Sequence, residues 1–233
     1  MQFTEKNSFH LRAAVYSLKK DTTGLEFLIF PMIHVGSREF YQEISRRLAS
    51  CDLILVEGLK SKKAAILTLS YRFVKKIRGM DLITQHEGLR LEEFRNKLLN
   101  TDMEANAFDE RWSTLPIALR IQLFLMVPIF VVYLFIFGTR ESLAENLVVE
   151  DLPSSEEELT EDEGFSRLDS LLVDERDRKL IEHIANVNNE RSHTSQRIGI
   201  VYGAFHMRSV MAFLMQKLNY RVAKADWVKV FDL

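Results

Sequence analysis

Two histidines and one glutamate each follow a short apolar run, which is where a buried strand would end. His34 follows "LEFLIFPMI", Glu57 follows "CDLILV", and His206 comes three residues after Gly203 in "RIGIVYGAFH". Because parallel and mixed sheets bind their ligands at the carboxyl ends of strands, we expect these side chains to meet at one edge of a sheet.

Two imidazoles and a carboxylate form a donor set that suits zinc, manganese or cobalt. His34, His206 and Glu57 are the candidate metal ligands. Alternatively, the histidines bind the metal and the glutamate activates water. Taken singly, either histidine also fits a purely structural role, in which its ring is hydrogen-bonded at the end of a strand.

A second feature lies on a predicted helix from about residue 165 to 188. Its apolar stripe contains Val173, Leu180, Ile184 and Val187, and Asp177 interrupts that stripe with Arg176 beside it. A buried carboxylate costs several kcal/mol unless it is paired or hydrogen-bonded. Arg176 and Asp177 are therefore either a structural ion-pair anchor or part of a functional site.

Composition narrows the class of protein. The 233 residues include 31 Lys and Arg, 33 Asp and Glu, and one cysteine, with a formal net charge of -2. Such a balance argues against a nucleic-acid binder that relies on bulk positive charge. One cysteine, Cys51, excludes an internal disulfide framework and a multi-cysteine zinc site. The N-terminal residues lack the apolar core of a signal peptide, so we expect a protein that is not secreted and is either cytoplasmic or membrane-associated.

The periodicity of the chain predicts an α/β fold with a mixed central sheet flanked by helices. An early hairpin and helix, a third strand, and a late strand–helix–strand unit account for both ends of the chain. Ser37 is the predicted N-cap of the first helix, and Asn219 is a predicted left-handed cap. The predicted strands are 9–18, 25–33, 51–59, 197–204 and 220–231, the helices begin at 38 and 207, and 80–89 is a short strand or strand-to-helix turn. We interpret the acidic run 153–164 as a solvated loop or a helix start.

Residues 121–138 form the most hydrophobic stretch, flanked by Arg120 and Arg140. Eighteen helical residues cover roughly 27 Å, close to a bilayer core of about 30 Å. A single crossing would separate His34 and Glu57 from His206, which conflicts with one shared site. The remaining alternatives are a hairpin broken at Pro128 that dips into one leaflet, an apolar cap on the domain, a buried helix, and a homodimer interface.

Four motifs in the same order resemble the TraB family, in the wider group that includes the PrgY, GumN and Tiki proteins. They are Pro31-Met32-Ile33-His34, "LILVEGL" at Glu57, "DERDRKLIEHI" with Arg176 and Asp177, and Gly203-Ala204-Phe205-His206. The first motif departs from the family's Gly-x-x-His pattern, because Pro31 replaces the glycine. Asp102 in "LLNTDMEANAFDERW" lies in a stretch that resembles an Asp-Met, then Glu-Phe pattern of some relatives, and Gln85 in "ITQHEGL" is a similar correspondence.

The resemblance implies a single TraB-like domain over residues 1–233, related in fold to erythromycin esterases and to the haem-binding ChaN proteins. Residues 60–164 would form a helical insertion that contains the apolar segment. It also implies a metal-dependent hydrolase, a peptidase in the case of the Tiki proteins, acting on a peptide or small-molecule substrate. His34 and His206 would bind the metal, with Glu57 as a further ligand or base. Arg176 would stabilise negative charge and Asp177 would orient a histidine or Arg176.

Two other functions compete with this one. The altered motif at Pro31 favours a non-catalytic regulatory or binding protein that uses residues 121–138 against a membrane or a partner. A weaker alternative is capture of haem or another small ligand by the histidines.

Overall fold

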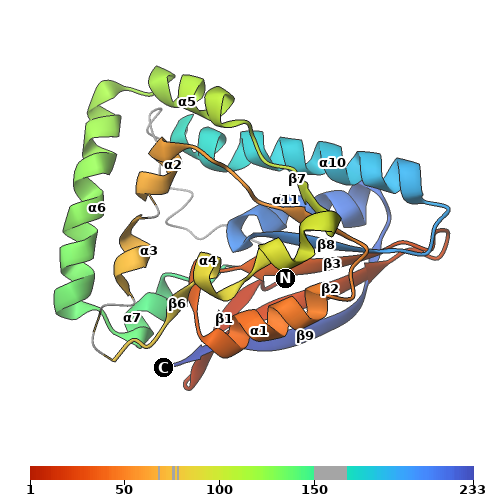
Figure 1. Ribbon diagram of the computed structural model, residues 1–233, viewed down its shortest axis with the longest axis horizontal. Coiled ribbons are helices and arrows are strands. Elements are labelled where there is room, and N and C mark those ends of the chain that lie inside the picture. Colours follow the sequence, from red (N-terminus) through yellow and green to blue (C-terminus); the bar gives the residue numbers. More distant parts are fainter. Residues whose placement is uncertain (68, 75–76, 78, 150–166) are drawn as a thin grey trace.

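The computed structural model describes residues 1–67, 69–74, 77, 79–149 and 167–233. Its centre is a mixed seven-stranded sheet (Figure 1). Six strands follow the order β1-β2-β3-β8-β5-β7, and β9 also pairs with β2, outside that order. The strands are β1 Thr4–Lys6, β2 His10–Lys19, β3 Glu26–Met32, β5 Leu53–Val56, β7 Leu98–Asn100, β8 Arg197–Gly203 and β9 Arg221–Asp232. The predicted α/β class with a mixed sheet flanked by helices is confirmed.

Parallel and antiparallel pairings divide the sheet into two halves. β3, β8, β5 and β7 are parallel neighbours, whereas β1, β3 and β9 all pair with β2 in the antiparallel sense. The parallel half brings four strand ends to one edge, which is the geometry that the sequence predicts for its candidate residues. A separate two-stranded ribbon joins β4 Val35–Gly36 to β6 Ile83–Thr84.

Helices cover both faces of the sheet. On one face lies α1 Arg38–Leu48, whose predicted N-cap Ser37 accepts the Phe40 N–H and whose Phe40, Ile44 and Leu48 enter the core. On the other lie α10 Glu175–Arg191 and α11 Met207–Ala212, which contribute Leu180, Ile184 and Val210 to the core there. Shorter helical turns extend these elements: η2 Ser170–Asp174, η3 Ala204–His206 and η4 Phe213–Lys217. Asn219 has a φ of 62°, as predicted for a left-handed cap.

The middle of the chain contributes strands as well as helices. Its elements are α2 Lys62–Leu67, α3 Leu69–Val74, β6, α4 Gln85–Gly88, η1 Leu91–Lys97, β7, α5 Ala105–Thr114, α6 Ile117–Phe137 and α7 Arg140–Glu145. Since β7 joins the main sheet beside β5, this segment completes the central fold and is not only an appended helical unit. The acidic run 153–164 lies outside the described residues.

The apolar segment forms one continuous helix, α6, in which Pro128 sits without breaking it. It stands at the edge of the molecule, beyond α2 and α3 (Figure 1). With 21 residues and a mean hydropathy of 2.3, α6 is long and apolar enough to cross a membrane by length and composition. Only 11% of its most apolar window is buried. Thus α6 is neither a buried core helix nor a Pro-broken hairpin.

The close packing of α4 against α1 can be tested by substitution of Gly88. A Cβ atom at Gly88 would lie 2.2 Å from Cδ2 and 2.8 Å from Cβ of Tyr41, which is fully buried and donates its hydroxyl hydrogen to the Ile33 carbonyl oxygen. We expect Gly88→Ala to lower the free energy of unfolding by about 1–3 kcal/mol through overpacking. Thermal and denaturant unfolding measure this loss. Gly203→Ala is the control, because its added methyl group would meet no atom closer than 3.4 Å. Equal losses in both variants would contradict the close packing of Gly88 against Tyr41.

Candidate functional site

Residues that follow four adjacent parallel strands meet at one edge of the sheet. His34 follows β3, His206 follows β8, Glu57 follows β5 and Asp102 follows β7. His206 Nε2 lies 4.0 Å from Glu57 Oε1, and the charges of Glu57, Arg176 and His206 all act on His34. The structure therefore brings together the candidate residues that the sequence places at strand ends.

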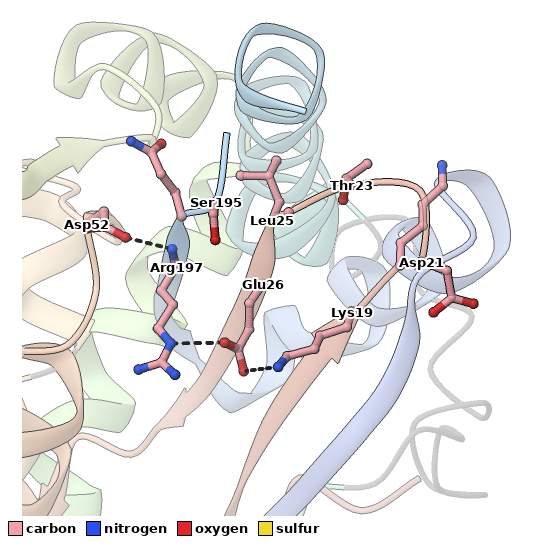
Figure 2. Close-up of a pocket in the computed structure, with 11 residues that line it drawn as sticks. Lys19, Asp21, Thr23, Leu25, Glu26, Asp52, Ser195 and Arg197 are labelled. Carbon is pink, nitrogen blue, oxygen red and sulfur yellow. Dashed lines mark hydrogen bonds and ion pairs between the residues drawn. The ribbon is translucent and has the colours of Figure 1, made fainter. Parts of the chain in front are cut away.

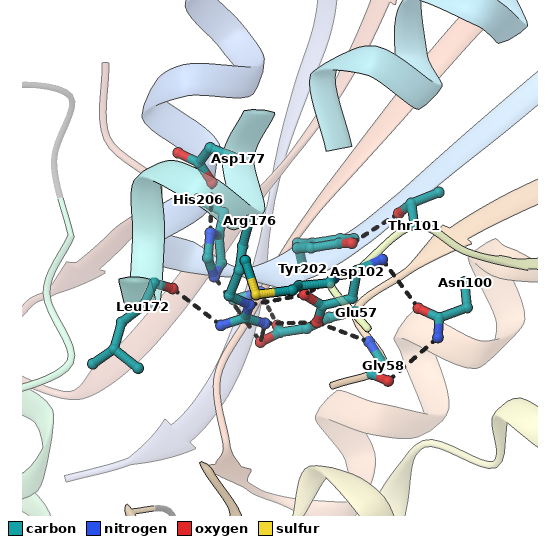
Figure 3. A network of polar contacts seen from close by, with 12 residues as sticks. Glu57, Gly58, Asn100, Thr101, Asp102, Leu172, Arg176, Asp177, Tyr202 and His206 are labelled. Carbon is teal, nitrogen blue, oxygen red and sulfur yellow. Dashed lines mark hydrogen bonds and ion pairs between the residues drawn. The ribbon is translucent and has the colours of Figure 1, made fainter. Parts of the chain in front are cut away.

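Arg176 connects α10 to the ends of β5 and β7 (Figure 3). Its Nε and Nη2 atoms donate to the two carboxylate oxygens of Asp102, both at 2.8 Å, and Nη2 also donates to Glu57 Oε1. A fourth bond of 3.2 Å runs from Nη1 to the Leu172 carbonyl oxygen. The side chain of Asp102 is 0% exposed and that of Arg176 is 8% exposed, so this is a buried, forked ion pair.

Backbone amides complete the solvation of the two carboxylates. The Gly203 N–H donates to Glu57 Oε2 at 2.9 Å, and the Gly58 N–H donates to Asp102 Oδ2 at 3.1 Å. Burial alone would raise the pKa of Glu57, but the charge of Arg176, with smaller contributions from His206 and His34, lowers the pKa to about 2. Glu57 is consequently a carboxylate at neutral pH and a weak proton acceptor.

Asp177, the residue after Arg176, holds the ring of His206. His206 Nδ1 donates to Asp177 Oδ1 at 2.6 Å, and both residues are buried. Because a carboxylate only accepts, this bond places the ring hydrogen on Nδ1 and leaves Nε2 of the neutral ring as an acceptor. The Tyr202 ring packs against the imidazole edge-to-face, with centroids 5.6 Å apart, and restricts its rotation.

His34 is half-buried and lies beside an aromatic ring. Its ring lies 5.0 Å, centroid to centroid, from the ring of Tyr71. Burial lowers the pKa of His34; the Glu57 carboxylate opposes this effect, while Arg176 and His206 reinforce it. His34 is therefore neutral at neutral pH. Gln85 contacts this site through its backbone, since its N–H donates to the His34 carbonyl oxygen at 2.8 Å.

Pro31, which stands where the TraB motif has glycine, fits its strand. The antiparallel register between β2 and β3 pairs Glu26 through Ile29 and stops before Pro31, so proline removes no bond from that ladder. On the other side, Pro31 remains in register with Tyr202 of β8. The substitution leaves the strand that carries His34 intact.

The sequence did not indicate two buried residues whose hydroxyl groups pair beside the site, Thr101 and Tyr202. The hydroxyl groups of Thr101 and Tyr202 are 2.8 Å apart in the interior, and each residue directly precedes a site residue, Asp102 or Gly203. The sequence does show a polar residue beside each of the two motifs. It does not show that the two residues pair, because their pairing depends on the order of the strands in the sheet. Asp102, which only the resemblance indicated, proves to be the bidentate partner of Arg176.

A second polar region lies at the opposite edge of the sheet (Figure 2). There Arg197 pairs with Glu26 at 2.9 Å, Lys19 approaches Glu26 at 3.7 Å, and the Arg197 N–H donates to Asp52. The charges of this open groove neutralise one another.

The site residues fit a divalent metal only in part. The two imidazoles are suitable donors, but both oxygens of Glu57 are engaged, one by the Arg176 guanidinium and the other by the Gly203 N–H. Within the described part of the chain, no group of three or more His, Cys, Asp or Glu side chains is placed to hold a metal ion. The ligand roles of His34, His206 and Glu57 therefore stay a prediction.

Comparisons with protein-family models, curated proteins and solved structures return no match to this chain. The TraB resemblance therefore rests on the motifs alone.

The low pKa of Glu57 predicts how stability depends on pH. Because its pKa is about 2 in the folded protein and 4.5 ordinarily, the carboxylate stabilises the fold above pH 4.5, and this contribution is lost as the pH falls toward 2. We expect Glu57→Gln to cost about 3 kcal/mol at pH 7 and to flatten the pH dependence in this window. Denaturant titrations at a series of pH values measure both effects.

Glu182→Gln is the matched control for this prediction. Glu182 pairs with Lys179 on the exposed side of α10, where such pairs contribute less than about 1 kcal/mol. A Glu57→Gln variant that resembles the control at every pH would show that the buried ion pair does not stabilise the protein.

Proposed function

We propose that this chain is a hydrolase, as the resemblance to the TraB family implies, and that His206 is its general base. The observation that carries the proposal is the 2.6 Å bond from His206 Nδ1 to the buried Asp177. That bond fixes the tautomer in which Nε2 accepts a proton, and it stabilises the imidazolium that forms when water or a substrate hydroxyl is deprotonated.

Glu57 and Arg176 have supporting roles in this proposal. A carboxylate whose pKa is about 2 is a poor proton acceptor at neutral pH, which favours His206 over Glu57 as the base. Arg176 acts as a positioning residue, because its bonds to Asp102 and Glu57 hold the strand end that faces His206 Nε2. Its remaining hydrogen-bonding capacity is available to stabilise a developing oxyanion.

The charge of the site bears on the substrate class. Apart from the two histidines, the cluster contains the carboxylates of Glu57, Asp102 and Asp177 and, among the described residues, one guanidinium, that of Arg176. An excess of negative charge disfavours anionic groups at the reaction centre. We propose peptides or small neutral or cationic esters and amides as substrates.

The base assignment predicts a large effect of Asp177→Asn. The amide holds His206 less well and permits the wrong tautomer, so we expect kcat/KM to fall by about 10³-fold with a changed pH profile. A panel of chromogenic esters, amides and peptides provides the assay. Asp174→Asn, an exposed position on the preceding turn, is the matched control. Full activity in folded Asp177→Asn or His206→Ala protein would contradict the base assignment.

Metal dependence is the second candidate, and two observations favour it. A histidine that donates Nδ1–H to a carboxylate is a frequent arrangement for a metal ligand, and the local excess of carboxylates attracts a cation. A resident metal would polarise the substrate or its attacking water.

Elemental analysis of wild type and His206→Ala, both checked for folding by circular dichroism, tests the metal. Metal-dependent hydrolysis predicts about one zinc, manganese or cobalt per wild-type chain and its loss in the variant. Equal metal content in both proteins would exclude His206 as a ligand. If metal is missing from both after soaking and chelators leave hydrolysis unchanged, the metal-free base mechanism is favoured.

A non-catalytic binding protein is the remaining alternative. It is favoured by the change to Pro31 in the first motif and by the exposed surface of α6. Folded wild-type protein that hydrolyses nothing in the substrate panel, with or without added metal, would support it over the hydrolase.

A further inference from the structure

Helix α6 presents an apolar surface to solvent around most of its circumference. Leu119, Leu123, Val127, Val131 and Leu134 form one buried or half-buried stripe that faces the domain. The other large apolar side chains are exposed, from Ile117 at 68% to Phe130 at 38%. They are Ile117, Ile121, Phe124, Leu125, Met126, Ile129, Phe130, Val132, Tyr133, Phe135, Ile136 and Phe137.

Both ends of α6 are anchored to the same domain. At its start, Leu119 packs with Phe108 and Trp112 of α5. At its end, Leu134 enters the main core, and Arg140 donates to the carbonyl oxygens of Met80 and Asp232. In Figure 1, α6 runs along the edge of the domain between α5 and α7. A helix tied to one body at both ends cannot cross a bilayer without unfolding one attachment.

The distribution of exposed side chains favours lipid over a second protein chain. At 100° per residue, the exposed positions cover every side of α6 except the stripe that faces the domain. A partner helix packs along one stripe and would leave the others in water. Acyl chains surround a helix and cover all of them, and a helix about 10 Å wide fits within one leaflet of a bilayer core of about 30 Å.

Basic side chains lie next to the apolar helix. α2 and α3 pack against α6, and residues 58–74 contain Lys60, Lys62, Lys63 and Arg72 with no Asp or Glu. Lys60, Lys62 and Arg72 are exposed. Cations beside an inserted apolar surface attract anionic headgroups.

A groove at the start of α6 is lined by both basic and apolar side chains. It is lined by Lys63 and Arg120 together with the apolar side chains of Trp112, Ile117, Ile121 and Phe124. Arg120 Nε is buried and has no hydrogen-bond acceptor among the described residues, while Lys63 donates to the Asp109 carbonyl oxygen. A phosphate beside an acyl chain would supply the missing acceptor and fill the apolar wall.

We propose that α6 lies in the plane of an anionic phospholipid bilayer, immersed in one leaflet. Lys62, Lys63, Arg72 and Arg120 bind lipid phosphates, and the sheet with its candidate site remains outside the membrane. This inference is independent of the proposed hydrolase activity, because it uses a surface that contributes no residue to that site.

Flotation with vesicles tests the proposal. Full-length protein should partition at least about tenfold more strongly into phosphatidylcholine vesicles containing phosphatidylserine than into pure phosphatidylcholine, and added salt should weaken the preference. Lys62→Glu/Arg72→Glu should remove most of the preference for anionic vesicles. Leu125→Asp/Ile129→Asp should abolish binding to both kinds of vesicle.

Lys217→Glu/Arg221→Glu is the control of equal charge change, since these exposed residues lie at the end of η4 and the start of β9. Its binding should match wild type. Circular dichroism confirms folding of every variant.

The depth of α6 distinguishes immersion from crossing. An environment-sensitive dye attached in turn to Ile121→Cys, Ile129→Cys and Ile136→Cys should report similar depths at all three positions. A deep central position with shallow ends would show a membrane span and overturn the in-plane arrangement. Wild-type protein that forms a dimer and ignores both vesicle types would assign the surface of α6 to a second copy and overturn the proposal.

Discussion

The buried guanidinium of Arg176 is the constraint on which the arrangement of this site depends. A charge in the interior is tolerated only when its hydrogen bonds and its countercharge are supplied together. Asp102, Glu57 and the Leu172 carbonyl oxygen meet that requirement. The Gly203 N–H satisfies the other oxygen of Glu57, and the Gly58 N–H adds a second bond to Asp102 Oδ2. The ends of β5, β7 and β8 are thereby fixed relative to α10 by one connected network.

The same network also places the histidine. Arg176 and Asp177 are consecutive on α10, so the bonds that fix the rotation of the helix through Arg176 also fix the direction in which Asp177 points. Asp177 then holds His206, which belongs to the turn after β8. The position of the candidate base His206 therefore depends on the ion pairs of Arg176. The link is the backbone between Arg176 and Asp177, so His206 and Arg176 need not touch.

Sequence periodicity predicted where strands and helices lie better than it predicted which residues pair between them. Apolar runs located the strands before His34, Glu57 and His206, and Asp177 was recognised because it interrupts an apolar stripe. The strand β7 was missed because three residues carry too little alternation, so Asp102 had only the family resemblance to indicate it. The choice of Asp102 and Glu57 for Arg176, and of His206 for Asp177, follows from the order β3-β8-β5-β7, which local patterns do not contain. Hydropathy identified α6, but only the packing of its neighbours revealed how little of it is covered.

The position of β8 between β3 and β5 governs the order in which the chain can be assembled. Glu26 of β3 pairs with Arg197 of β8, so the centre of the sheet cannot close until the ribosome has released residues 197–203. By then α6 has already been synthesised, while the core that anchors it at Leu134 is incomplete. Translation thus leaves α6 without its anchor in the core until β8 and β9 have been made, and during that interval aggregation competes with folding.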